Sequence, residues 1–125
     1  MIRHPTDAYQ HGQRLALTPC AAEASAFTKA ALLLVKAKYR EDDYTSYATA
    51  VKFNQVLWTL IQSDLSENAS RFPDVLKSDL LSLSLFVDRQ TVKALSEPKA
   101  EHLEPLIEID RNIARGLRAK EKAPG

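Results

Sequence analysis

The sequence has one cysteine, three glycines and no long run of apolar residues in its 125 positions. A single thiol, Cys20, cannot form an intramolecular disulfide, and this cysteine usage gives no sign of an oxidising compartment. No segment approaches the roughly 20 apolar residues of a membrane span, and the N-terminus lacks the apolar stretch of a signal peptide. We therefore expect a cytoplasmic protein that inserts into no membrane.

The scarcity of glycine also limits the fold. With only Gly12, Gly116 and the terminal Gly125, the chain lacks the dense turn punctuation of an all-β protein. Apolar residues recur at helical spacing, and a hydrophobic content of 45% suits one core. The predicted fold is all-α, a compact antiparallel bundle of about four helices in one domain over residues 18–120. Residues 1–17 are predicted to form a loosely attached N-terminal arm, and residues 121–125 a disordered tail.

Start and stop signals place the four helices along the chain. Thr18 can cap the first helix, and Pro19 suits its first position, where an N–H would be unpaired anyway. This helix is predicted to end at about residue 39, and the second, capped by Asp42 or Asp43, at about residue 65. The third opens at a proline and ends near residue 95, and the fourth covers roughly 102–120. Short connections predict antiparallel neighbours.

The second helix has a polar residue within its apolar stripe. The stripe consists of Tyr47, Val51, Asn54, Trp58, Ile61 and Leu65. An unpaired amide in a core is expensive, so we expect the Asn54 side chain to bond a neighbouring helix or a loop carbonyl and to fix the register of packing.

The second and third helices also carry apolar residues away from their main stripes. These residues are Phe53, Val56 and Leu60 in the second helix and Leu81, Leu85 and Val92 in the third. In one interpretation the two helices form a central hairpin, covered on both faces by the first and fourth helices. In the other, part of this second apolar face stays open as a groove for a partner helix. These six residues, with Trp58 as a candidate interface anchor, form the predicted partner-binding set.

Patterns typical of catalysis or metal binding are missing. His4 and His11 have no carboxylate or cysteine at ligand spacing, so the four donors of a tetrahedral metal site cannot be assembled. The glycines are isolated, which excludes a phosphate-binding fingerprint. No carboxylate pairs by its spacing with a nucleophile or a base. We therefore predict no metal, no cofactor and no enzymatic activity.

The charges are balanced overall but not along the chain. Seventeen basic and sixteen acidic residues give a net charge of +1, which argues against nucleic-acid binding by the whole domain. The last helix nevertheless ends in a basic segment that contains Arg111, Arg115, Arg118, Lys120 and Lys122. Cations at a helix C-terminus complement the helix dipole, which explains the segment without a ligand. RNA contact is the functional alternative, although no aromatic residues are interleaved for base stacking.

Four stretches taken together point to a known family. They are Thr18-Pro19 with Glu23-Ala24, Asn54-Gln55-Val56-Leu57-Trp58 with Asp64-Leu65, Leu83 to Arg89, and Pro105 to Ile113 with Arg115-Gly116-Leu117. Each is weak alone, but their order and spacing over about residues 18–117 resemble the FlaF family of flagellar biosynthesis regulators. The last stretch departs from the family's pattern, because Asp110-Arg111-Asn112 stands where an Asn-Arg pair is expected.

The resemblance implies a non-enzymatic protein of flagellum biogenesis that acts after flagellin transcription, beside a partner regulator called FlbT. Family members are also compared with flagellin export chaperones, small helical bundles that shield the aggregation-prone terminal helices of flagellin. The expected function is flagellin binding as an export chaperone, post-transcriptional regulation of flagellin synthesis, or both. The expected partners are the amphipathic terminal helices of flagellin and a FlbT-type regulator.

Two other functions stay open from the sequence. One is a translational regulator that contacts flagellin messenger RNA through the basic C-terminal helix, with binding that weakens steeply as salt rises. The other is a homo-oligomeric helical adaptor that buries its second apolar face against another copy of itself.

Overall fold

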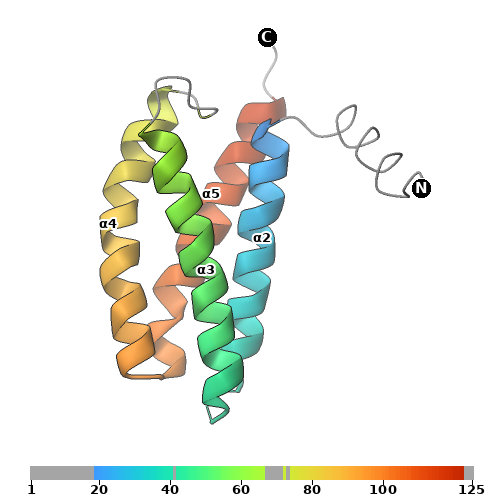
Figure 1. Ribbon diagram of the computed structural model, residues 1–125. Helices are drawn as coiled ribbons and strands as arrows, with labels where there is room; N and C mark the ends of the chain where they lie inside the picture. Colours follow the sequence, from blue (N-terminus) through green and yellow to red (C-terminus); the bar gives the residue numbers. More distant parts are fainter. Residues whose placement is uncertain (1–18, 41, 67–71, 73, 123–125) are drawn as a thin grey trace, which may run out of the picture.

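The computed structural model describes residues 19–40, 42–66, 72 and 74–122. Within these ranges the chain forms four α-helices, α2 (Pro19–Lys38), α3 (Tyr44–Leu65), α4 (Asp74–Ser96) and α5 (Glu104–Lys122), and a short 3-10 helix, η1 (Ala100–His102). Consecutive helices run in opposite directions, so the start of α2 and the end of α5 lie at the same end of the bundle (Figure 1). The predicted all-α antiparallel bundle is confirmed. The predicted arm, residues 1–17, lies outside the described residues.

The helix bounds follow the sequence signals closely. α2 begins at Pro19 as expected, and α4 begins at Asp74, next to the proline that was predicted to open it. α5 begins later than predicted because η1 occupies the residues before it, and it continues to Lys122, two residues into the segment predicted as a tail.

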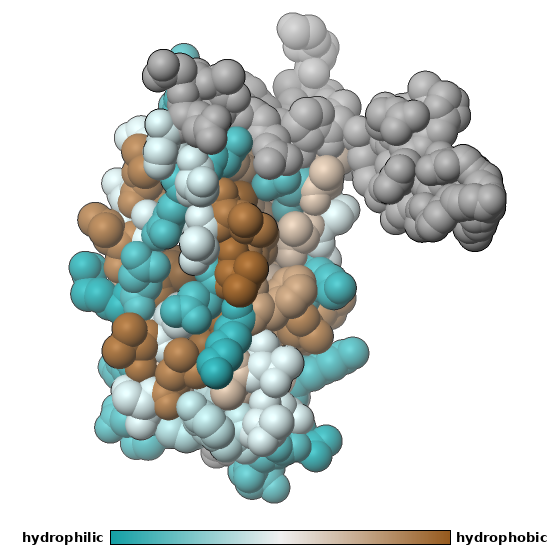
Figure 2. Space-filling view, viewed as in Figure 1, coloured by the Kyte–Doolittle hydropathy of each residue, from teal (hydrophilic) through white to brown (hydrophobic). Residues whose placement is uncertain are grey.

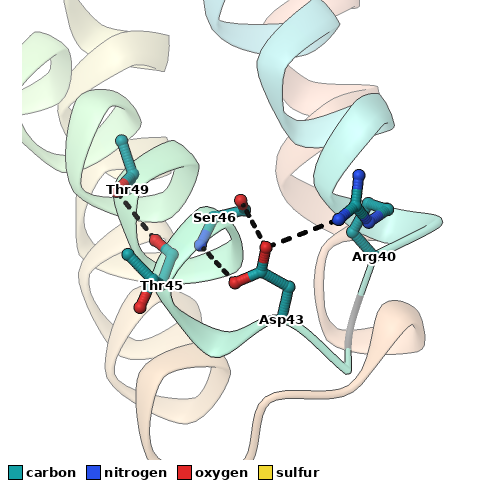
Figure 3. Close-up of polar contacts among 5 residues, drawn as sticks. All are labelled: Arg40, Asp43, Thr45, Ser46 and Thr49. Carbon is teal, nitrogen blue, oxygen red and sulfur yellow. Dashed lines mark hydrogen bonds and ion pairs between the residues drawn. The ribbon is translucent and has the colours of Figure 1, made fainter.

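Asp43 caps the start of α3. Its carboxylate accepts hydrogen bonds from the backbone N–H of Ser46 at 3.2 Å and from the Ser46 hydroxyl at 2.9 Å, and Arg40 lies 3.6 Å away (Figure 3). The hydrogen bonds to Ser46, its backbone N–H first, lower the pKa of Asp43, because they stabilise the ionised form. The side chain therefore satisfies one of the amides that every helix start leaves unpaired.

The core is built around the pair α2 and α5, which make the most extensive contact in the bundle. Ala24, Ala30 and Ala31 of α2 and Ala114 of α5 are small and buried, and Ala31 and Ala114 line the same groove between the two helices. Such small side chains let two helix axes come close together. The apolar stripe predicted for α3 is confirmed, since all six of its residues are buried.

Of the two interpretations of the second and third helices, now α3 and α4, the covered central hairpin is wrong for α4: the two helices are neighbours, but α4 is not central. α3 packs between α2 and α4, whereas α4 contacts chiefly α3 and has few contacts with α5. The reason is visible in the side chains that α4 buries, which include Ser84, Thr91 and Ala94. A helix with polar and small residues on its inner side buries less apolar surface and takes an outer position.

The C-terminal end of α4 is held to α3 and η1 by hydrogen bonds to backbone oxygens. The Tyr47 hydroxyl donates to the Lys99 oxygen at 2.9 Å, and the Tyr44 hydroxyl to the Leu95 oxygen at 3.3 Å. The Gln90 amide donates to the His102 oxygen at 2.8 Å. His102 is buried, and its Nδ1 lies 2.6 Å from the oxygen of Glu97. These contacts fix the direction in which the chain enters α5.

Gly116 offers a test of the α5 helix. It is exposed within the helix, and a Cβ added there would meet no heavy atom within 4 Å beyond its chain neighbours and its own helix backbone. We expect Gly116→Ala to raise the free energy of unfolding by roughly 0.5–1 kcal/mol, because alanine loses less backbone freedom on folding. Urea denaturation measures this change. Ala119→Gly, at an exposed position of the same helix, should lower stability by a similar amount, and a loss of stability in Gly116→Ala would contradict the helical environment described here.

Candidate functional site

A buried polar network connects α3 with α5. The indole N–H of Trp58 donates to Oδ1 of Asp110 at 3.1 Å. The carboxamide of Asn54 faces the same carboxyl group. With its NH2 turned toward Asp110, it donates to Oδ1 at 3.3 Å and to Oδ2 at 2.5 Å. All three side chains are buried. The partner of Asn54 is thus a carboxyl group of the last helix, in agreement with the expectation that it bonds a neighbouring helix.

The carboxyl group of Asp110 titrates far from its usual range. Burial raises its pKa to about 7, because a low-dielectric environment disfavours the charged form. The hydrogen bond from Trp58 acts in the opposite direction, and a second donor, the Asn54 NH2, also favours the ionised form. Burial is the larger effect, so the pKa of Asp110 stays above its ordinary value.

The same network fixes how α3 is rotated in the bundle. Asn54 and Trp58 point inward toward Asp110, and a residue two positions further along a helix is turned by about 200°. Val56 and Leu60 occupy those positions and are therefore on the outer side of α3. Trp58, which was proposed as an interface anchor, is only 1% exposed. A partner could reach it only if the bundle opened.

The other predicted partner-binding residues lie at the surface. Val56, Leu60, Leu81, Leu85 and Val92 are between 48% and 64% exposed. Phe53 is half-buried, and the ammonium group of Lys29 lies 5.3 Å from the centre of its ring. The covered interpretation of the second apolar face is therefore wrong for all of these residues except Phe53.

The exposed residues form two rows, not one continuous face. The α3 row, Val56 and Leu60, lies toward α2, where Leu60 borders a groove of about 500 Å³ and Phe53 a second of about 370 Å³. The α4 row consists of Leu81, Leu85 and Val92. Figure 2 shows apolar side chains gathered over α3 and others spaced along α4, with hydrophilic side chains between them.

Three of the five basic residues singled out in the sequence come together in another groove. Arg111, Arg115 and Arg118 of α5 line a groove of about 580 Å³ between α2 and α5. Lys120 and Lys122 belong to α5, but their side chains lie outside what the structure describes. The groove also has an apolar part, formed by Ala31, Leu32, Ala114 and Ala119.

The described residues contain neither a metal site nor a membrane-spanning helix. Among them, no group of three histidine, cysteine or acidic side chains is placed to hold a metal ion. None of the helices within the described ranges is long and apolar enough to cross a membrane. His4 and His11 lie in residues that the structure does not describe.

An antiparallel helical bundle that exposes rows of large aliphatic side chains is typical of small helical proteins that bind other proteins. A comparison with known protein families identifies the family of this chain. The family model for flagellar protein FlaF matches residues 5–117, most of the chain, so the chain belongs to the FlaF family and is a flagellum-related protein. Comparisons with curated proteins and with solved structures gave no match.

Sequence reasoning missed the burial of Asp110, although a signal was present. Leu106, Asp110, Ile113 and Leu117 follow one another at helical spacing, and the acidic residue lies within that apolar stripe. Asn54 and Trp58 likewise lie within the apolar stripe of α3. A carboxyl group and two side-chain donors on facing stripes indicate a buried pair, because each group costs free energy when it is left unpaired.

The raised pKa of Asp110 predicts how stability depends on pH. Between about pH 4 and pH 7 the folded protein keeps a proton on Asp110 that the unfolded chain has lost, so the free energy of unfolding falls as pH rises through this window. Above about pH 7 this contribution is constant. Asp110→Asn should remove that slope, since a neutral amide can still accept from Trp58 and pair with Asn54. Urea denaturation at several pH values compares the two proteins.

Asp110→Ala serves as the control for this experiment. It leaves the donors of Trp58 and Asn54 unpaired, so we expect it to be about 2–5 kcal/mol less stable than Asp110→Asn at every pH. If the original protein instead gained stability relative to Asp110→Asn between pH 4 and pH 7, the carboxyl group would be ionised in the folded state, and the raised pKa would be refuted.

Proposed function

We propose that this chain is a non-enzymatic flagellum-assembly protein that binds flagellin and holds its amphipathic terminal helices on the α3 and α4 rows. The observation that carries the proposal is the exposure of Val56, Leu60, Leu81, Leu85 and Val92. Soluble domains seldom leave several large aliphatic side chains exposed on adjacent helices without a partner. The apolar side of an amphipathic helix provides a complementary surface, and membership in a flagellar family supports flagellin as its source.

The expected affinity follows from the surface that is still available. Full burial of an aliphatic side chain contributes about 1.5–3 kcal/mol, so each half-exposed residue adds about 1 kcal/mol on binding. The partner helix contributes a similar amount from its own apolar side. Ordering an unfolded flagellin end costs about 2–5 kcal/mol of this gain. After the further cost of bringing two molecules together, binding is no tighter than about −8 kcal/mol, which corresponds to micromolar affinity and permits release when flagellin is exported.

The same complex provides a way to regulate flagellin synthesis after transcription. A protein that is free or occupied according to the amount of unexported flagellin can signal that amount to a second regulator. We propose a FlbT-type regulator as that second partner.

Isothermal titration with flagellin tests the proposal. We expect saturable binding to full-length flagellin and none to a flagellin without its terminal helices. The double variant Val56→Ser with Leu60→Ser, and the triple variant Leu81→Ser with Leu85→Ser and Val92→Ser, should each weaken binding by about tenfold or more, because each removes about 1.4 kcal/mol or more of apolar contact. Comparing the two shows which row the partner covers more fully.

Val75→Ser is the matched control. Val75 is strongly exposed near the start of α4 and belongs to neither row, so its replacement should leave binding unchanged. Flagellin binding that survives both row variants, or that persists without the terminal helices, would contradict the proposal. Sedimentation at micromolar concentration tests the homo-oligomeric alternative, which predicts a dimer that the row variants dissociate.

A further inference from the structure

The groove between α2 and α5 combines charge with an apolar floor. Arg111, Arg115 and Arg118 occupy positions i, i+4 and i+7 of α5 and line one side of it. With a rise of about 1.5 Å per residue they form a cationic edge about 10 Å long. Leu32, which is 55% exposed, projects from α2 on the opposite side.

The positive charge of this edge is not neutralised by carboxylates. The guanidinium of Arg115 donates to Oδ1 of Asn112 at 2.7 Å, and that of Arg118 to the Thr28 hydroxyl at 2.9 Å. Both acceptors are neutral. Within the described residues none of the three arginines forms an ion pair with an acidic side chain. Three adjacent cations that lack counter-charges favour a ligand that supplies carboxylates.

The floor of the groove indicates what kind of molecule carries those carboxylates. It is formed by Ala31, Ala114 and Ala119, and no aromatic side chain lines it. Small side chains let a helix come close to the two helices of the groove. A nucleic acid would find no ring on which to stack a base. The lining therefore suits the apolar side of a helix better than a nucleotide chain.

The ends of this chain do not complement the groove in charge. Residues 1–17 contain Arg3 and Arg14 against the single acidic residue Asp7, and residues 119–125 contain two lysines against one glutamate. Neither segment has enough carboxylate side chains to pair with three arginines. The charge of these two segments therefore favours an occupant from another molecule.

We propose that the α2–α5 groove is a second docking site, separate from the α3 and α4 rows, and that it binds an acidic amphipathic helix of a partner protein. Carboxylates at positions i, i+4 and i+7 of that helix would pair with Arg111, Arg115 and Arg118, while its small apolar residues cover Leu32 and the alanine floor. This inference does not depend on flagellin binding, because it uses other helices and other chemistry.

Fluorescence anisotropy with synthetic peptides tests the proposal. The probe is a labelled amphipathic helix of about five turns, with glutamates at i, i+4 and i+7 beside a face of alanine and leucine, and its partner probe has glutamine at the same three positions. We expect the glutamate peptide to bind with a Kd on the order of 10–100 μM and the glutamine peptide at least about tenfold more weakly. Binding should weaken as salt rises.

Two charge-matched variants locate the site. Arg111→Gln with Arg115→Gln and Arg118→Gln should weaken binding of the glutamate peptide by about tenfold or more. Lys52→Gln with Arg89→Gln and Lys93→Gln removes the same charge from exposed positions of α3 and α4 and should leave it unchanged. Far-ultraviolet circular dichroism checks that both variants keep their helices.

Several outcomes would overturn the proposal. Equal binding of the two peptides would show that carboxylates are not recognised, and equal loss in both variants would show an unspecific charge effect. A labelled single-stranded RNA of about 20 nucleotides completes the test. If it bound through the three arginines while the glutamate peptide did not bind, the groove would be a nucleic-acid site.

Discussion

The hydrogen bonds between Asp110 and the two side chains of α3 are the constraint on which the rest of the bundle depends. A carboxyl group in the core is tolerated only where donors face it, and the donors here are Trp58 and Asn54, one helical turn apart. Any rotation of α3 about its axis, or any slip along α5, would separate them. The surface that α3 presents to solvent is thus decided in the interior, because an inward Asn54 and Trp58 leave Val56 and Leu60 outside.

The helices could be predicted from the sequence because their signals are local. The proline at position 19, the capping Asp43 and the periodic apolar residues gave bounds within a few positions of those observed. Which helices would be neighbours could not be predicted in the same way. The close contact of α2 with α5 depends on alanines, whose small size carries little hydrophobic signal, and the outer position of α4 depends on Ser84 and Thr91 within a stripe that otherwise looks apolar.

The candidate sites were predictable to different degrees for a related reason. Exposure on the far side of a stripe follows from helix geometry, so Leu60, Leu85 and Val92 could be selected from the sequence. That the arginines share a groove with Leu32 could not, because the contact joins residues about 80 positions apart that only the packing of α2 on α5 brings together.

The α4 helix is fastened unequally along its length. Near its C-terminal end, the Leu95 oxygen accepts from Tyr44 of α3, and the Gln90 amide of α4 donates to the His102 oxygen of η1. Closer to the middle of α4, the exposed side chains of Asp88 and Gln62 form a hydrogen bond to α3. The aliphatic row of α4 therefore spans two kinds of support: Val92 lies in the half that polar contacts fix, and Leu81 in the half that rests on the core through buried side chains such as Leu80.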